Sequence, residues 1–172
     1  MPVYKRTPLY KSFSAVTSST VANTTTPTAF SQSYTIKSDS LTLGKSIHLI
    51  GRGVYSTLAA TPGSENIFVN LNSLTIATSG GFTASANKVN AMAHVDVIIT
   101  CLATGVSGTI EVQGMFTNET GNGAAQLFSL ENVAGITINT TLDQVLKIAV
   151  QWGTADPANT VTLRQFVVEE LG

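Results

Sequence analysis

The residues that could support catalysis or metal binding are few and widely separated along the chain. Its two histidines, His48 and His94, each stand alone, because no HExxH, CxxC or His-Xaa-His pattern is present. A zinc or iron site is therefore not expected. His94 and Asp96 are two residues apart, a spacing that puts both side chains on one strand face and could orient the imidazole beside the carboxylate. Same-face polar pairs are common on strands, so we interpret this pair as surface residues.

The sequence also contains no clear motif for a catalytic nucleophile or for a pair of catalytic acids. No GxSxG elbow occurs, and the Gly-Val-Ser-Gly stretch at 105–108 is interpreted as a turn. Glu131, Asp143 and Asp156 could converge from loops as the paired carboxylates of a glycosidase, although solvated loop acids are the favoured interpretation. Cys101 is the only cysteine, which excludes an internal disulfide and indicates a small buried hydrophobe. We therefore predict that the chain is not an enzyme and has no cofactor and no metal site.

Aromatic residues that could stack on a sugar ring are also scarce in the predicted loops. Tyr55 and Trp152 are candidates for glycan binding, but both alternate with core residues, so core packing is the default explanation. Phe82 is the clearest aromatic residue in a predicted loop. Glycan binding is therefore an alternative rather than the leading hypothesis.

The composition favours an assembling protein with an uncharged surface. Only 11% of the residues are charged, while 43% are hydrophobic and much of the remainder is Ser, Thr, Asn and Gly. Such a chain depends on packing rather than on ion pairs, and we expect copies of itself to cover part of its surface. No run reaches the length of a membrane span, and the N-terminus lacks the apolar segment of a secretory signal. A membrane partner is therefore not expected.

The charge distribution separates a basic N-terminal arm from an acidic body. Lys5, Arg6, Lys11 and Lys37 precede the first acidic residue, Asp39. We predict that residues 1–27 are an extended, Ser/Thr-rich arm and that residues 28–172 are the folded domain. The arm could contact nucleic acid, but docking on a neighbouring subunit is favoured because aromatic groups bury much area per ordered residue. The residues assigned to this assembly arm are Tyr4, Lys5, Arg6, Leu9, Tyr10 and Phe13.

The body alternates apolar and polar residues with a period of two, which is typical of β-strands. The clearest stretch is 92–116, where Val95, Val97, Ile99 and Cys101 share a face and a glycine turn at 105–108 separates two runs. This pattern predicts a central antiparallel hairpin. Further strands are expected at 29–36, 46–56, 66–71, 74–77, 126–130, 135–139, 146–152 and 161–168. The chain is predicted to be all-β, an antiparallel β-sandwich or jelly roll of about eight strands.

Two details of these strands carry further predictions. Gly51 and Gly53 share one face of the 46–56 strand, which would let another backbone or a large ring approach closely. In the last strand, Phe166 and Val168 alternate with Val167, so apolar residues occur on both faces. We interpret one of these faces, with Phe166 and Val168, as a subunit interface.

Three segments resemble small virion proteins of tailed bacteriophages: SIHLIGRGVYST at 46–57, GTIEVQGMFT at 108–117, and VLKIAVQWGTADPANTVTLRQFVVEELG at 145–172. In that group an early strand ends in Gly-Xaa-Tyr-Ser-Thr, and a terminal hairpin closes the domain. The resemblance covers roughly residues 28–172 and leaves out the arm. It implies a jelly-roll domain that trimerises and is displayed on the virion as a head decoration, head fibre or tail-fibre module, without a cofactor.

These observations together predict a non-enzymatic phage structural protein, located in the virion, that decorates or cements the capsid as a homotrimer. Its expected partners are copies of itself and capsid or other virion proteins. The alternative is a receptor- or glycan-binding module of a head or tail fibre. A polysaccharide-degrading enzyme is a third hypothesis that would need converging carboxylates.

Overall fold

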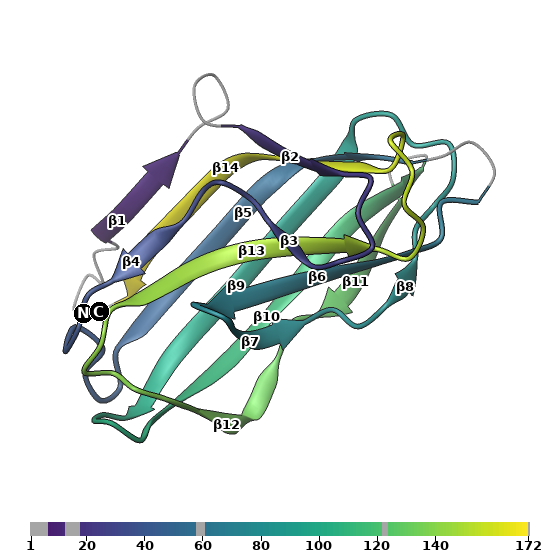
Figure 1. The fold of residues 1–172 in the computed structure, drawn as a ribbon. Helices are drawn as coiled ribbons and strands as arrows, with labels where there is room; N and C mark the ends of the chain where they lie inside the picture. Colours follow the sequence, from purple (N-terminus) through teal and green to yellow (C-terminus); the bar gives the residue numbers. More distant parts are fainter. Residues whose placement is uncertain (1–6, 13–17, 58–60, 122–123, 172) are drawn as a thin grey trace.

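The computed structural model describes residues 7–12, 18–57, 61–121 and 124–171, and these form fourteen strands in two antiparallel sheets packed face to face (Figure 1). No helix occurs in the described residues, so none there could cross a membrane. The predicted antiparallel β-sandwich is confirmed. The strands outnumber the expected eight because several short strands extend the edges of the two sheets.

The larger sheet has eight strands. Its order is β1 (Thr7–Ser12), β14 (Thr160–Leu171), β5 (Ser46–Ser56), β9 (Ala91–Ala103), β10 (Gly108–Gly121) and β11 (Ala124–Ser129), with β2 (Ser19–Ala22) paired to β14 and β12 (Asn132–Ile138) paired to β10. The smaller sheet has six strands: β3 (Thr28–Ala29), β13 (Gln144–Trp152), β6 (Ser64–Leu71) and β7 (Leu74–Thr78) in order, with β4 (Tyr34–Ile36) on β13 and β8 (Phe82–Thr83) on β6.

The predicted central hairpin is present as β9 and β10, which pair antiparallel in the larger sheet. Val95, Val97 and Ile99 face the core and are buried, whereas Ile98 on the opposite face is exposed. Cys101 is a buried free thiol, and its burial agrees with its position in the alternation. β9 and β10 are long, neighbouring strands, and each has one apolar face. Together they form much of the surface against which the smaller sheet packs.

The two glycines of β5 are explained by close approach of neighbouring atoms, as predicted. A Cβ atom on Gly51 would lie 2.6 Å from the Ile148 side chain of the smaller sheet. A Cβ atom on Gly53 would overlap the backbone oxygen of Thr162 on β14. Only glycine fits at these positions without moving a neighbour.

The last two long strands do not form a hairpin, so this part of the prediction is wrong. β13 belongs to the smaller sheet and β14 to the larger one, and the loop at 153–159 crosses between the sheets. The Asn159 side chain is buried at the end of this loop and donates its Nδ2 hydrogens to the Pro62 oxygen at 2.9 Å and the Thr154 oxygen at 3.3 Å. Alternation alone cannot distinguish this crossing from a hairpin, because both connect two half-buried strands.

A β-bulge in β14 also changes which residues face the core. The pairing of β14 with β5 shifts between Leu163 and Gln165, so Arg164 is an extra residue on β14. Leu163 before the bulge and Phe166 and Val168 after it are all buried in the core. Phe166 and Val168 have no exposed surface within a single chain. Their side chains are therefore not accessible to a second subunit, as the predicted interface would require.

The described part of the N-terminal arm pairs with the same chain. β1 and β2 both pair with β14, Leu9 packs half-buried against the core, and Val21 is buried (Figure 1). Tyr10 lies in β1, but its side chain is outside the described part. The other predicted arm residues, Tyr4, Lys5, Arg6 and Phe13, lie outside the described residues. The boundary between arm and domain at residue 27 stays a prediction.

Candidate functional site

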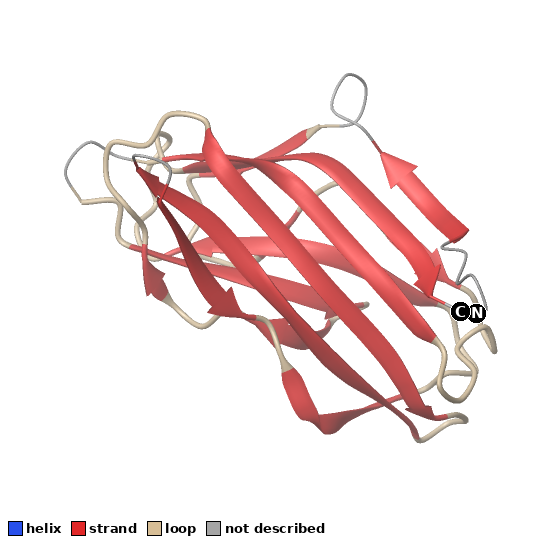
Figure 2. Ribbon diagram, turned by 180° about the vertical axis from the view of Figure 1, so that it is seen from behind, coloured by secondary structure: helices blue, strands red, loops and turns tan. Residues whose placement is uncertain are grey.

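The outer face of the larger sheet is the most extended open surface of the described chain. Seen from behind, no further layer of strands covers it (Figure 2). We use "outer face" for the side chains of β5, β9, β10 and β14 that point away from the core. They include His48, Ile50, Arg52, Val54, Met92, His94, Asp96, Ile98, Thr100, Leu102, Glu111, Gln113, Met115, Thr117, Glu119, Gln165, Val167 and Glu169.

A histidine–carboxylate contact lies on this face, but it is not the predicted one. His48 Nε2 is 2.8 Å from Asp96 Oδ1, and since a carboxylate only accepts, the imidazole donates this hydrogen bond. His48 Nδ1 is 3.9 Å from Glu169 Oε2. The sequence spacing suggested His94 as a possible neighbour of Asp96, but the hydrogen bond comes from His48, because β5 lies beside β9 and brings His48 within reach.

The electrostatics of His94 differ from those of an exposed histidine. Burial lowers the pKa of His94, and the guanidinium of Arg52, directly opposite on β5, lowers it further. Neither His48 nor His94 is hydrogen-bonded to a serine or cysteine in the part of the chain that the structure describes. The cluster therefore has a base-like imidazole and carboxylates but no described nucleophile beside them.

Two basic residues meet beside this cluster. An open hollow between β5 and β14 is lined by Arg52, Gly53, Val54, Arg164 and Gln165. Arg164 reaches the hollow because it is the extra residue of the β14 bulge, and bulges commonly redirect a side chain in this way. The sequence alone does not predict that Arg52 and Arg164 are neighbours, because 111 residues lie between them. Only the folded sheet brings their two strands together.

A second open hollow lies further along the outer face. It is lined by Ile98, Thr100, Glu111 and Gln113 of β9 and β10. The Gln113 side-chain amide donates a hydrogen bond to the Glu111 carboxylate. Hydroxyl, amide and carboxylate groups on one flat surface could bind either water or the hydroxyl groups of a ligand.

Apolar side chains surround these polar groups. Met92, Ile98, Leu102 and Met115 on the outer face and Leu127 on β11 are all exposed. No phenylalanine, tyrosine or tryptophan is among the exposed large hydrophobic residues of the described chain. The outer face therefore has the composition of a mixed protein surface rather than of an aromatic sugar platform.

The aromatic residues considered for glycan binding are buried. Tyr55 and Trp152 have no exposed surface, which confirms their interpretation as core residues. Phe82 is also buried and stacks on Phe128 with ring centroids 3.9 Å apart. None of the three is available to a ligand at the surface.

The interior near Tyr55 contains an unusual group of polar side chains. Both carboxyl oxygens of Glu65, both amide atoms of Asn118 and Nε1 of Trp152 are buried without a hydrogen-bond partner in the described structure. Burial raises the pKa of Glu65 to about 8 and, together with the charge of Glu65, raises the pKa of Tyr55 to about 12. Glu65 is therefore a neutral acid at pH 7, which reduces the cost of burying it.

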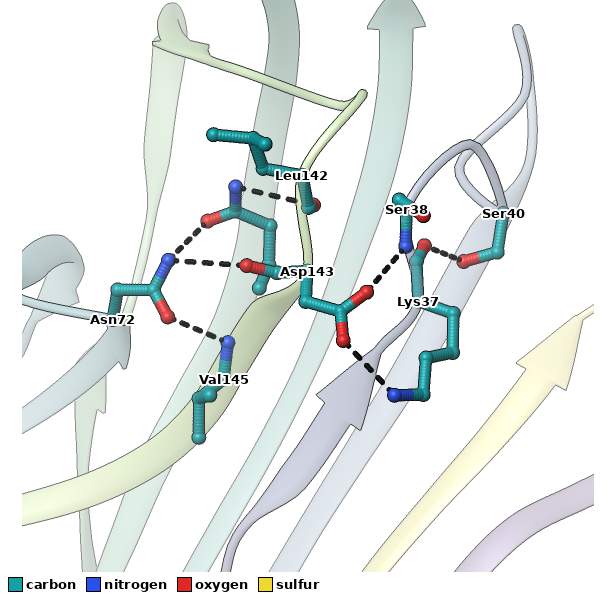
Figure 3. Close-up of polar contacts among 8 residues, drawn as sticks. Lys37, Ser38, Ser40, Asn72, Leu142, Asp143 and Val145 are labelled. Carbon is teal, nitrogen blue, oxygen red and sulfur yellow. Dashed lines mark hydrogen bonds and ion pairs between the residues drawn. The ribbon is translucent and has the colours of Figure 1, made fainter.

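Two of the loop acids considered as paired catalytic carboxylates, Asp143 and Asp156, make structural contacts. Asp143 accepts hydrogen bonds from Lys37 Nζ at 2.9 Å and from the Ser38 backbone at 2.8 Å (Figure 3), and these hydrogen bonds lower its pKa. Asp156 accepts a hydrogen bond from the Ala158 backbone at 2.8 Å. Glu131 lies between β11 and β12.

Metal-binding and thiol chemistry find no support in the described residues. Those residues contain no group of three or more His, Cys, Asp or Glu side chains arranged to hold a metal ion. Burial raises the pKa of the Cys101 thiol, and its Sγ lies 3.4 Å from the Ala103 oxygen. A buried thiol with a raised pKa is a poor nucleophile.

No protein-family model and no curated protein matches this chain. Among solved structures, it is similar to the CBM2 module of the evolved Dit of Lactobacillus casei BL23 phage J-1, with 9% identity, 96% of each chain covered and a TM-score of 0.40. Peanut lectin shows 9% identity over 96% of this chain and 97% of the lectin, with a TM-score of 0.45. A lectin from Bauhinia forficata shows 10% identity over 99% of both chains, with a TM-score of 0.37. Similarity of this degree supports no inference about a ligand.

Proposed function

We propose that this chain is a non-enzymatic structural module of a tailed-bacteriophage virion that assembles as a trimer through the outer face of its larger sheet. The assignment to a phage particle, as a capsid decoration or cementing protein, is based on the sequence resemblance of residues 28–172. The self-association is based on the structure. Arm residues such as Tyr4, Tyr10 and Phe13 are proposed to add contacts to neighbouring subunits or to capsid proteins.

The observation that carries the proposal is the open outer face with its exposed apolar side chains. Ile98 and Met115 lie near its centre, on the adjacent strands β9 and β10, and Met92 and Leu102 lie towards the two ends of β9. Burying apolar surface contributes about 25 cal/mol per Å².

The proposal that the chain is not an enzyme is supported by the contacts of its candidate catalytic groups. His48 pairs with Asp96 without a nucleophile among the described residues, and Asp143 and Asp156 stabilise loops. Each group therefore has a structural role that does not require a substrate. Assays on a panel of bacterial polysaccharides test this part, and release of oligosaccharides would contradict it.

The test of self-association is the mass of the full-length protein in solution, measured by light scattering. We expect a trimer for the wild type and a monomer for the double variant Ile98→Asp/Met115→Asp, because two buried carboxylates would face apolar surface. Leu74→Asp is the matched control, since Leu74 is equally exposed but lies on β7 of the smaller sheet. A wild-type protein that stays monomeric at tens of micromolar would contradict the proposal.

A glycan-binding module is the second candidate, and the hollow lined by Ile98, Thr100, Glu111 and Gln113 favours it. Its hydroxyl, amide and carboxylate groups could hydrogen-bond to sugar hydroxyls. A glycan array separates the two candidates. Specific binding that is lost in Gln113→Ala, with the fold intact, would favour this second function, whereas an empty array leaves the assembly role as the simpler explanation.

A further inference from the structure

The outer face of the larger sheet carries two arginines on adjacent strands and, on another strand, a glutamate that pairs with no basic side chain of the described chain. Arg52 and Arg164 meet in the hollow at the β5–β14 side of the face. Glu119 lies on β10, at the opposite side. Strand pairing places these groups at nearly the same height along the strands, because Met92 of β9 pairs with Val54 in the hollow, and Glu119 follows Asn118, which pairs with Ala93.

The two arginines lack an acidic partner among the described residues, in contrast to Lys37 and Lys45. Lys37 pairs with Asp143 at 2.9 Å and Lys45 with Glu170 at 3.0 Å. No ion pair of Arg52 or Arg164 occurs within the described residues. Two guanidinium groups that line one hollow repel each other, and an oxyanion between them would relieve this repulsion.

A guanidinium group is well suited to a carboxylate. Its planar donors match the two oxygens of the carboxylate, and its weak hydration lowers the cost of removing it from water. The hollow is also lined by Gln165, whose side-chain amide is a further hydrogen-bond donor. The hollow thus has donors that suit a carboxylate.

Glu119 is positioned to supply such a carboxylate to another copy. The Tyr55 hydroxyl donates a hydrogen bond to the backbone oxygen of Glu119, which fixes the chain at this point. The Glu119 carboxylate is half-exposed, and its only polar contact in the described residues is a long hydrogen bond of 3.4 Å from the Met92 backbone. No basic side chain pairs with it there.

We infer that the Arg52–Arg164 hollow binds a carboxylate, and that the carboxylate is Glu119 of a second copy of this chain. β5 and β10 are separated by one strand, so the two sites are roughly 10 Å apart across the face. Within one chain the described residues show no such ion pair, and the Glu119 carboxylate accepts a hydrogen bond from the Met92 backbone. A second copy can supply the contact if its Glu119 lies against the arginines of the first.

The contact joins unlike sides of the same face, so it is head-to-tail. A head-to-tail contact closes into a ring when the rotation between copies is a whole fraction of a turn, which is one third for the proposed trimer. The inference rests on the proposed self-association and adds to it the pairs of residues that set the orientation of the subunits.

Charge reversal tests the inference. Arg164→Glu and Glu119→Arg should each weaken trimer formation at least tenfold, measured by sedimentation equilibrium, because like charges would then face each other. The combined variant Arg164→Glu/Glu119→Arg should recover association to within about threefold of wild type, since the pair is restored with reversed signs. Lys147→Glu on β13 is the control for charge reversal outside the face and should associate like wild type.

The possible results separate the inference from the proposed function. A wild-type trimer that is unaffected by both single changes would overturn the inference and leave the self-association intact. Single changes that weaken the trimer without recovery in the combined variant would overturn Glu119 as the partner. A monomeric wild type would overturn the proposed function and the inference together. Urea unfolding of each variant establishes that loss of association is not loss of folding.

Discussion

Glu65 shows how one buried side chain can make stability depend on pH. Its pKa is raised by burial from 4.5 to about 8, so between these values the folded chain holds a proton that the unfolded chain releases. Stability therefore declines as pH rises through this window and is greatest below the unfolded-state pKa. By the free energy of each pKa unit, the decline amounts to roughly 3–5 kcal/mol.

We expect Glu65→Gln to remove most of this decline. The amide has nearly the same shape but does not titrate, so the variant should be more stable than wild type at pH 8.5 and similar to it at pH 5. Urea unfolding at both values measures the difference. If wild type and variant lost stability in parallel between the two pH values, Glu65 would not be the responsible group.

Gly53 shows how one absent side chain permits two strands to pair. An added Cβ atom would overlap the backbone oxygen of Thr162, which cannot move without breaking the β5–β14 pairing. We expect Gly53→Ala to cost about 2–3 kcal/mol in urea unfolding. Gly81→Ala is the control, since nothing lies within 4 Å of its added Cβ, and it should be close to neutral. Equal stability of the two variants would contradict this account.

At the scale of elements, β14 attaches the N-terminal strands β1 and β2 to the larger sheet. It pairs with β5 along one edge and with β1 and β2 along the other. β1 contributes the half-buried Leu9 to the core, whereas β2 contributes the buried Val21. The arm therefore has two parts whose removal should have different consequences.

Stepwise truncation tests this division. A variant without residues 1–17 loses β1 and should remain folded with a lower Tm. A variant without residues 1–27 also loses β2 and exposes the surface that Val21 covers. This should lower the free energy of unfolding by about a further 1–2 kcal/mol, the order of the contribution of one buried valine. Thermal and urea unfolding measure both steps. Truncations as stable as the full chain would show that β14 does not depend on the arm.

At the scale of the whole molecule, the proposed assembly combines apolar burial with a charged contact, and salt distinguishes the two. Sodium chloride screens exposed charges, with a Debye length of about 10 Å at 0.1 M and about 3 Å at 1 M. If the arginine hollow orients the subunits, trimer formation should weaken several-fold between these concentrations. Sedimentation equilibrium at the two concentrations measures this. Association that strengthens steadily with salt would indicate a purely apolar interface.

The sequence by itself determined the strands and the inward-facing residues of this protein. The alternation over 92–116 predicted β9, β10 and the burial of Val95, Val97 and Cys101, because a sheet with one buried face must alternate. The buried state of Tyr55 and Trp152 followed from the same pattern. These are local properties, which the residue types along one strand are sufficient to specify.

Only the tertiary structure decided which strands are neighbours, and the candidate site depends on that. His48 contacts Asp96 because β5 lies beside β9, and Arg164 joins Arg52 because a bulge in β14 turns it towards β5. The same bulge places Phe166 and Val168 in the core instead of at an interface. A single inserted residue reverses the face of every residue that follows it, and alternation cannot detect this where both faces carry apolar residues.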